Sequence, residues 1–224
     1  MSVAAASIAA ARPVVVVTAP ADEDRARGHV YALFGNLLAA PPDADLLGTL
    51  ASIGPDPADR SLLAAAWKML GEAAGRATLP ALRDEYQALF IGLGRGEVVP
   101  YGSWYLTGFL MEQPLARLRS DLAELGIERQ ADVKEPEDHA GALCDAMAIM
   151  IAGDDPVPVE RQARFFAQHM EPWMERFFRE LQRADSARFY RAVGLLGEQF
   201  VAVERQAFGM DFPAAGTDSR NGRR

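Results

Sequence analysis

The sequence predicts an all-α protein, a helical bundle of about nine to eleven helices in two closely packed lobes. Apolar residues recur at three- and four-residue steps along most of the 224-residue chain, as on the buried face of a helix. Gly and Pro pairs separate these stretches, and no alternation typical of a β-strand persists. We expect lobes at about 22–125 and 135–210, joined by a polar connector at 126–134. A hinge of this kind is compatible with a monomer or with a dimer that exchanges lobes.

Composition and charge narrow the class of protein. Lys and Arg total 23 against 31 Asp and Glu, so the net charge is 23 − 31 = −8. This excess of acid argues against a nucleic-acid partner and favours cationic partners. Cys144 is the only cysteine, which excludes an internal disulfide, and its place near an apolar helix face predicts a buried, inert thiol. These features fit a cytoplasmic protein.

The N-terminus resembles a secretory signal only superficially. Ala4–Ala11 and Val14–Val17 are apolar, but no basic segment precedes them and Arg12-Pro13 interrupts them. No apolar run reaches the roughly 18–20 residues that span a bilayer, so we expect no stable membrane insertion. We expect residues 1–21 to form a flexible tail and residues 211–224 to be disordered.

Helices in the first half have recognisable start and stop signals. Asp22-Glu23-Asp24 supplies the acids of a first turn, and Pro41-Pro42 ends the helix that follows. Gly54-Pro55 ends a second helix. The first helix has a core stripe formed by Val30, Tyr31, Phe34, Leu37 and Leu38, and three further helices are expected at 44–53, 57–75 and 79–91.

Residues 92–101 form the least helical-looking segment. Three glycines in five residues suggest a phosphate loop, but no Lys-Ser/Thr pair follows and the spacing matches no nucleotide-binding pattern. We prefer a flexible connector that presents the aromatic loop, which we define as residues 100–105, Pro-Tyr-Gly-Ser-Trp-Tyr. Tyr and Trp are common at binding surfaces, although packing of these rings in the core remains an open alternative.

Helical periodicity then resumes and continues to the C-terminal tail. One helix is expected through Leu106, Phe109, Leu110, Leu115, Leu118, Leu122 and Leu125, ending at Gly126. His169 should lie near the end of a later helix, where a cation complements the helix dipole. Helices of the second half are expected at 136–152, at 158–170, from Pro172 through Leu181, and at 185–208.

The segment Glu135-Pro136-Glu137-Asp138-His139 stands at the head of the helix expected at 136–152. Pro136 suits a first helical position, and Glu137 and Asp138 would then lie in the first turn. We expect Asp138 to be partly exposed and to face the aromatic loop, with His139 beside it. From local chemistry alone, acids that simply cap a helix are the favoured explanation, because acids that complement the helix dipole are common in a first turn.

Two motifs together carry a family resemblance. Tyr86-Gln-Ala-Leu-Phe90 leads to the aromatic loop, and Glu135-Pro136-x-Asp138-His139 follows later in the chain. This combination resembles the TorD/DmsD family of redox-enzyme maturation chaperones over about residues 25–210. The resemblance implies a cytoplasmic, helical, non-enzymatic protein without a cofactor. It also implies a twin-arginine signal peptide, and the catalytic subunit of a molybdenum-cofactor oxidoreductase, as partners. The amino-acid sequence from Tyr101 to Ile127 looks most like that of relatives associated with formate dehydrogenases.

The resemblance also implies which residues bind the peptide. The matching positions are Glu135, Pro136, Asp138 and His139 in the acidic segment, and Pro100, Tyr101, Ser103, Trp104 and Tyr105 in the aromatic loop, with Tyr86 and Phe90 expected nearby. Gly102 departs from the family pattern, because many relatives have a larger, often acidic, residue there. If that acid contacts the peptide, this chain lacks one contact.

Physical chemistry predicts different roles for the aromatic loop and for Asp138 in binding such a peptide. The two guanidinium groups of a twin-arginine peptide pair best with carboxylates, each contact contributing about 1.5–3 kcal/mol. Ordering a flexible peptide costs roughly 2–5 kcal/mol, so apolar contacts must supply most of the net affinity. We therefore expect the aromatic loop to contribute more to affinity and Asp138 more to the recognition of arginine.

Three other functions remain open from the sequence. Glu135, Asp138 and His139 have spacing that a metal site can use, although only His29 and His169 are available elsewhere as histidine ligands. Nucleotide binding has been proposed for the resembling family, but no phosphate-binding Lys-Ser/Thr is present. A helical adaptor without a peptide groove is the third alternative.

Overall fold

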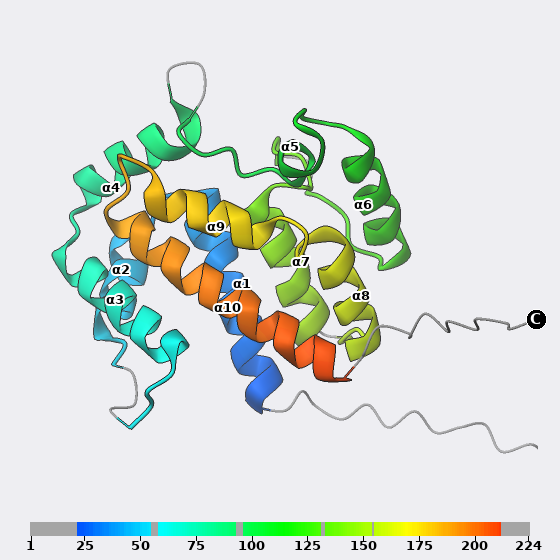
Figure 1. The fold of residues 1–224 in the computed structure, drawn as a ribbon, viewed down its shortest axis with the longest axis horizontal. Helices are drawn as coiled ribbons and strands as arrows, with labels where there is room; N and C mark the ends of the chain where they lie inside the picture. The colour runs from blue at the N-terminus through cyan, green and yellow to red at the C-terminus, as the bar shows by residue number, and fades with distance from the viewer. Residues whose placement is uncertain (1–21, 55–57, 93–95, 131–132, 154, 212–224) are drawn as a thin grey trace, which may run out of the picture.

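The computed structural model describes residues 22–54, 58–92, 96–130, 133–153 and 155–211 (Figure 1). Within these ranges the chain forms ten α-helices and one π-helix and contains no strand, which confirms the all-α prediction. The predicted N-terminal tail and the C-terminal tail beyond residue 211 lie outside the described residues.

The helix bounds follow the apolar periodicity closely in most places. The elements are α1 (Asp22–Ala39), α2 (Ala44–Ser52), α3 (Leu62–Arg76), α4 (Leu79–Tyr86), the π-helix η1 (Gln87–Ile91), α5 (Gly102–Thr107), α6 (Gln113–Glu124), α7 (Ala140–Ala152), α8 (Val159–His169), α9 (Met174–Arg183) and α10 (Phe189–Asp211). The first helix buries Tyr31, Phe34, Leu37 and Leu38, as its stripe predicts.

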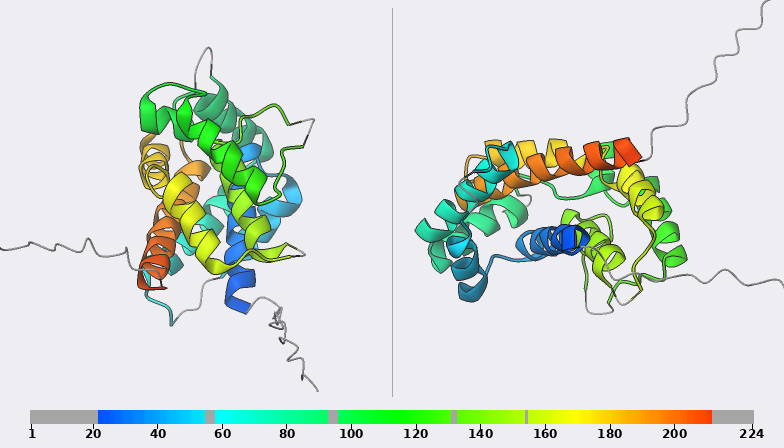
Figure 2. Two further views of the ribbon diagram at one scale, coloured as in Figure 1. Left: turned by 90° about the vertical axis from the view of Figure 1, so that its right-hand side faces the viewer. Right: turned by 90° about the horizontal axis from the view of Figure 1, so that it is seen from below.

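Two layers of helices make the centre of the bundle. Figure 2 shows α9 and α10 running across one face, with α1 and α7 packed behind them. The helices α2, α3 and α4 lie at one end of these layers, and α5, α6 and α8 lie at the other (Figures 1 and 2). Phe34 of α1 joins the layers, because its ring centroid lies 5.3 Å from that of Phe178 and 5.8 Å from that of Phe200.

A close approach between α9 and α10 depends on a glycine. A Cβ atom built on Gly197 would lie 2.3 Å from the Phe178 ring, so only glycine lets the two helices pack at this distance. A single buried apolar cluster contains side chains from both predicted lobes, and α1 of the first makes its largest contact with α7 of the second. The division into lobes stays a prediction, and part of the connector, residues 131–132, lies outside the described residues.

A buried ion pair fastens α1 to α10. Glu204 is 1% exposed, and its two carboxylate oxygens accept hydrogen bonds at 2.9 Å from Nε and Nη2 of Arg27. The Tyr31 hydroxyl donates to the same carboxylate at 2.9 Å. Burial raises the pKa of Tyr31 well above its usual value, and the charge of Glu204 adds to this. Both oxygens of Glu204 are therefore satisfied, as a buried charge requires.

Two expected helix bounds were wrong, and the helix expected at 79–91 spans those residues but changes type along its length. The helix expected from residue 57 begins at Leu62, because the Ser61 side chain accepts the Ala64 N–H and caps it. The fourth helix ends at Tyr86 and continues as the π-helix η1. The last helix spans 189–211 instead of 185–208, and its first turn is capped from another helix by Glu85.

Two further expectations failed at the site itself. The helix expected through Leu106–Leu125 is broken between α5 and α6, where Gly108 has φ +81° and Met111 has φ +60°. The helix expected from Pro136 begins at Ala140, and His139 is its N-cap residue. Pro136, Glu137 and Asp138 therefore precede α7 and do not form its first turn.

Candidate functional site

The two motifs singled out in the sequence meet through their backbones. Tyr101 and His139 form an isolated antiparallel bridge. The Gly102 N–H donates to the Asp138 carbonyl at 2.9 Å, and the Ala140 N–H donates to the Pro100 carbonyl at 2.8 Å. This pairing keeps His139 in an extended conformation, after a turn in which its N–H donates to the Pro136 carbonyl, so α7 begins only at Ala140.

Asp138 is the central side chain of this junction. Its Oδ2 atom accepts a hydrogen bond at 2.8 Å from the Ser103 N–H at the start of α5. Asp138 is 4% exposed, so the expectation of a partly exposed carboxylate was wrong, although the side chain does face the aromatic loop. Its Oδ1 atom is buried and has no hydrogen-bond partner among the described residues. A half-satisfied buried carboxylate is costly to the fold, and such a group calls for an explanation.

Asp138 is among the residues that line a cavity of about 690 Å³, which we call the α5–α6–α8 cavity. Its polar lining includes Asp121 and Arg117 from α6 and His169 from the end of α8. Its apolar walls come from Leu106, Pro114, Leu118, Leu143 and Pro172. The unpartnered carboxylate oxygen therefore belongs to a residue that borders a space large enough for a ligand group.

His139 and Tyr101, the two residues of the backbone bridge, also contact each other through their rings. The Gly141 N–H donates to His139 Nδ1 at 3.1 Å, which leaves the proton of the neutral ring on Nε2. Burial lowers the pKa of His139, against the charges of Glu135 and Asp138 that raise it. The Tyr101 hydroxyl donates to Glu135, and its ring meets the His139 ring edge-on at 5.2 Å. Glu135 itself is exposed, and the Pro136 carbonyl accepts the His139 N–H.

Tyr86 and Phe90 belong to a structural aromatic cluster. The Tyr86 hydroxyl donates to the carbonyls of Leu38 and Ala39, at 3.0 and 2.9 Å, and so caps the end of α1. Its ring lies 5.0 Å from that of Phe90, and both rings pack on Tyr190. Burial and the charge of Glu135 raise the pKa of Tyr86 to about 12. Tyr86 is therefore influenced by the acidic segment through the charge of Glu135.

The remaining aromatic-loop residues differ in their packing. Tyr105 stacks on the buried Trp173 at 5.2 Å and donates from its hydroxyl to Glu180 at 2.7 Å. Trp104 is half-buried, and Ser103 is fully buried. A Cβ atom on Gly102 would lie 3.1 Å from Trp173 Nε1, so the indole fills the space that a larger residue would need. This explains locally how the chain accommodates its departure from the family pattern.

An exposed apolar surface borders the same cavity. Four large side chains at the end of α5 and in the turn that follows are 43–72% exposed: Leu106, Phe109, Leu110 and Met111. The turn is held in place, because the Met111 N–H donates to Ser103 Oγ at 3.2 Å and Thr107 Oγ1 donates to the Phe109 carbonyl. We call these four residues the 106–111 apolar surface. A run of apolar side chains held out to solvent is typical of an interaction site.

Sequence reasoning missed this surface and two polar residues of the cavity. Leu106, Phe109 and Leu110 fit a continuous helical stripe, and only Gly108 and Pro114 signal the break. Asp121 gave no signal, because its partner His169 lies 48 residues away, at 2.6 Å between Asp121 Oδ2 and His169 Nε2. His169 was expected at a helix end and does end α8, but its contact with a carboxylate was not foreseen.

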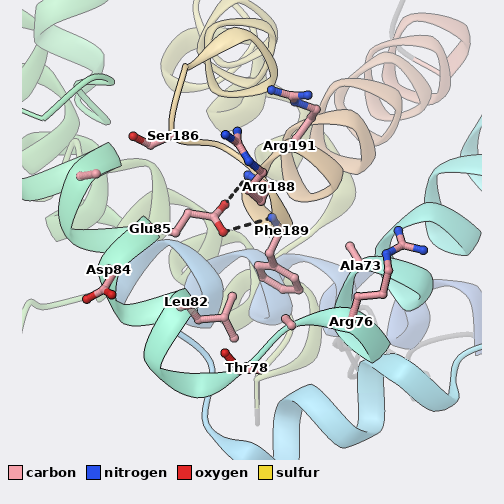
Figure 3. A pocket seen from close by; sticks show the side chains of 13 residues that line it. Ala73, Arg76, Thr78, Leu82, Asp84, Glu85, Ser186, Arg188, Phe189 and Arg191 are labelled. Carbon is pink, nitrogen blue, oxygen red and sulfur yellow. Dashed lines mark hydrogen bonds between the residues drawn. The ribbon is translucent and has the colours of Figure 1, made fainter.

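A second cavity of about 720 Å³ lies between α3, α4 and the start of α10. Figure 3 shows Glu85 in its wall, pointing at the first residues of α10. Both oxygens of Glu85 are occupied, since they accept the N–H groups of Arg188, Phe189 and Tyr190 at 2.8–3.1 Å. The carboxylate here caps a helix and has no unmet hydrogen-bonding capacity, unlike Asp138.

The alternatives left open by the sequence can be compared with the structure. Glu135, Asp138 and His139 turn to three different donors, and in the described part of the chain no three His, Cys, Asp or Glu side chains are grouped as a metal site requires. Residues 93–95 of the suggested phosphate loop lie outside the described residues. Cys144 is buried, and burial raises the pKa of its thiol. None of the helices in the described ranges has the length and apolarity to cross a membrane.

Comparisons with known proteins agree with one another. The model of the nitrate reductase delta subunit family matches residues 56–179, more than half of the chain. The chaperone protein TorD of Shewanella loihica is 28% identical over 210 residues, which cover 85% of this chain and 95% of TorD. The Tat proofreading chaperone DmsD of Salmonella typhimurium is 31% identical over 124 residues, 54% of this chain and 59% of DmsD.

The fold has a counterpart among solved structures. The crystal structure of a redox enzyme maturation protein from Archaeoglobus fulgidus superposes with a TM-score of 0.52 at 19% sequence identity, covering 79% of this chain and 93% of that protein. That likeness supports the fold, while the family follows from the sequence matches. The family's named members are chaperones and not enzymes. This chain belongs to the nitrate reductase delta subunit family and, within it, to the TorD/DmsD redox-enzyme maturation chaperones.

Proposed function

We propose that this protein is a cytoplasmic, system-specific chaperone that binds the twin-arginine signal peptide of a molybdenum-cofactor oxidoreductase and assists its maturation before export. The observation that carries the proposal is the buried Asp138 carboxylate, whose Oδ1 atom has no partner among the described residues. A guanidinium group from the peptide would supply the missing hydrogen bonds and the missing positive charge together.

The geometry favours an arginine over other ligands. Asp138 Oδ2 is fixed by the Ser103 N–H, so the carboxylate keeps one orientation and needs no reordering when a ligand arrives. Burial strengthens a charge-assisted hydrogen bond because the effective dielectric constant is low. Ammonium and guanidinium groups would both satisfy the charge, but only guanidinium provides a planar set of N–H donors.

The 106–111 apolar surface offers a place for the apolar stretch that follows the arginines in such a leader. Leu106 belongs both to this surface and to the lining of the α5–α6–α8 cavity, so the two regions are continuous. Burying exposed Phe, Leu and Met side chains contributes about 25 cal/mol per Å², enough to offset the ordering of a peptide. This extends the apolar contact beyond the aromatic loop, whose Tyr105 is stacked on Trp173.

The proposed client is a molybdoenzyme catalytic subunit. Formate dehydrogenase is the favoured class, because the sequence from Tyr101 to Ile127 resembles relatives associated with formate dehydrogenases. The relatives named TorD and DmsD support the class of chaperone and leave the client to be identified. A gene for a molybdoenzyme with a twin-arginine leader beside the gene for this chain would identify the client.

Calorimetry with that leader tests the proposal. We expect binding of the unaltered chain, and 10- to 100-fold weaker binding by Asp138→Asn, the effect of losing one charge-assisted contact of about 1.5–3 kcal/mol. Asp45→Asn is a matched control, since it removes a charge from the exposed first turn of α2. A double-mutant cycle against Arg→Gln in the peptide should show coupling at Asp138 and none at Asp45. No heat at high micromolar peptide in several salt conditions would refute the proposal.

A further inference from the structure

We propose that Asp121 is the second arginine-binding carboxylate of the α5–α6–α8 cavity, and that the incoming guanidinium replaces His169 as its partner. The inference rests on the proposed function and names the residue that makes the site selective for two consecutive arginines. Asp138 alone offers one unpartnered oxygen, which can accept from only one of the two side chains in a close, buried geometry.

Asp121 and Asp138 reach the cavity from different elements. Asp121 lies on α6 and Asp138 precedes α7, and both line the same space of about 690 Å³. Consecutive arginines in an extended peptide point in opposite directions, so two carboxylates on separate walls suit them better than two on one helix face. Apart from His169, the other polar residues of the lining carry no negative charge: Arg117 is positive, and the rest are the uncharged Ser103, Thr107, Gln113, Ser120 and Gln168.

The present partner of Asp121 can be exchanged. His169 Nε2 lies 2.6 Å from Asp121 Oδ2, and no other described side chain bonds to Asp121 Oδ1. The Asp121 side chain is 38% exposed and so remains within reach of a ligand, while that of His169 is 9% exposed. An imidazole gives Asp121 one N–H, whereas a guanidinium can give both carboxylate oxygens an N–H at once.

His169 can lose this partner without leaving its place. Its ring packs against Phe165 with centroids 5.0 Å apart, and its carbonyl accepts the Trp173 Nε1–H at 2.7 Å. These contacts do not involve Asp121. The exchange therefore needs a rotation of the Asp121 side chain and no movement of α8.

Calorimetry with full-length protein and four synthetic leaders, Arg-Arg, Arg-Gln, Gln-Arg and Gln-Gln, tests the inference. For the unaltered chain we expect the Arg-Arg leader to bind at least 10-fold more tightly than the better single-arginine leader. Asp121→Asn should bind the Arg-Arg leader about 10-fold more weakly and should prefer it over the better single-arginine leader by less than 3-fold. Glu124→Gln is the matched control, because Glu124 is exposed one turn further along α6 and does not line the cavity. It should behave as the unaltered chain.

A second test is spectroscopic and uses only the unaltered protein, so it does not depend on whether a variant folds. The imidazole NMR signals of His169 should shift when the Arg-Arg leader saturates the protein. They should stay at the position seen in the free protein when the bound leader lacks the arginine that contacts Asp121. Leader binding that depends on Asp138 but not on Asp121, with unmoved His169 signals, would overturn this inference and leave the proposed function standing. Absence of leader binding by the unaltered chain would overturn both.

Discussion

Two buried acids in this molecule are satisfied to different degrees. Glu204 has both oxygens bonded, to Arg27 and to Tyr31, and joins α1 to α10. Asp138 has one oxygen bonded to the Ser103 N–H and the other without a partner in the described chain, beside a cavity. Their exposed fractions are nearly equal, 1% and 4%. Burial alone therefore does not distinguish an acid that holds the fold together from one that can bind a ligand. The number of hydrogen bonds that each carboxylate oxygen accepts does distinguish them.

The largest expected effect is on the structural acid. Glu204→Gln should lower the free energy of unfolding by about 3 kcal/mol, because Arg27 is left with a neutral partner in a mostly buried place. Urea unfolding measures this, and the folded fraction should bind the leader with unchanged affinity. Glu72→Gln, in the exposed pair of Glu72 with Arg76, is the control and should cost less than about 0.5 kcal/mol. A loss of leader affinity in folded Glu204→Gln would break the comparison.

The second prediction separates the two oxygens of Asp138. Asp138→Ala removes the acceptor for the Ser103 N–H and should cost about 1–2 kcal/mol of stability. Asp138→Asn keeps an acceptor there and should cost clearly less, although both variants lose leader affinity. Paired thermal and urea unfolding of the two variants checks this. Equal destabilisation by Asn and Ala would mean that the charge itself, and not the Oδ2 contact, holds the start of α5.

A third carboxylate extends the comparison to pH. Burial raises the pKa of Asp145 on α7 to about 6, and no charged partner in the described part of the chain compensates it. Its folded pKa exceeds the unfolded value near 4, so ionisation opposes folding, and stability falls as pH rises from about 4 to 6. Asp145→Asn should therefore raise stability at pH 7, by under about 1 kcal/mol since water screens its exposed part, and should change nothing at pH 3.5. A gain of the same size at both pH values would contradict the assignment to burial of the charge.

The smallest effect concerns the charge at the cavity wall. Arg117 lines the cavity with Asp138 and opposes the approach of a cationic peptide. Arg117→Gln should tighten leader binding about 2-fold at low salt, an effect of about 0.4 kcal/mol, and the gain should fade as salt screens the charge. Calorimetry in low and high salt measures the difference. Weaker binding would show that Arg117 contacts the leader directly.

Local sequence pattern was sufficient to predict most of the fold. The geometry of the site could not be predicted in this way, because it depends on contacts between residues distant in sequence. Tyr31, Phe34 and Leu37 are buried on α1 because a 3.6-residue period specifies one face wherever a core is available. The start of α7 could not be predicted in the same way, because His139 is held extended by its pairing with Tyr101, 38 residues earlier. Without that pairing, Pro136 and its acids have every local feature of a helix start.

The chemical identity of the site residues was likewise easier to predict than their surroundings. That Asp138 faces the aromatic loop followed from the motifs, but its burial and its bond to the Ser103 N–H did not. Tyr86 and Phe90 were expected near the peptide and instead pack on Tyr190, a residue 100 or more positions later in the chain. Their role at the site stays a prediction.

The antiparallel bridge between Tyr101 and His139 has a consequence for synthesis of the chain. The start of α5 is completed by an acceptor that the ribosome adds 35 residues after Ser103, and the cavity wall at His169 follows 31 residues later still. At roughly 5–20 residues per second, Ser103 waits a few seconds for Asp138 to be made. A nascent chain that has emerged only as far as α6 therefore has no leader site, and a ribosome-bound fragment ending near residue 130 should ignore a peptide that the finished protein captures.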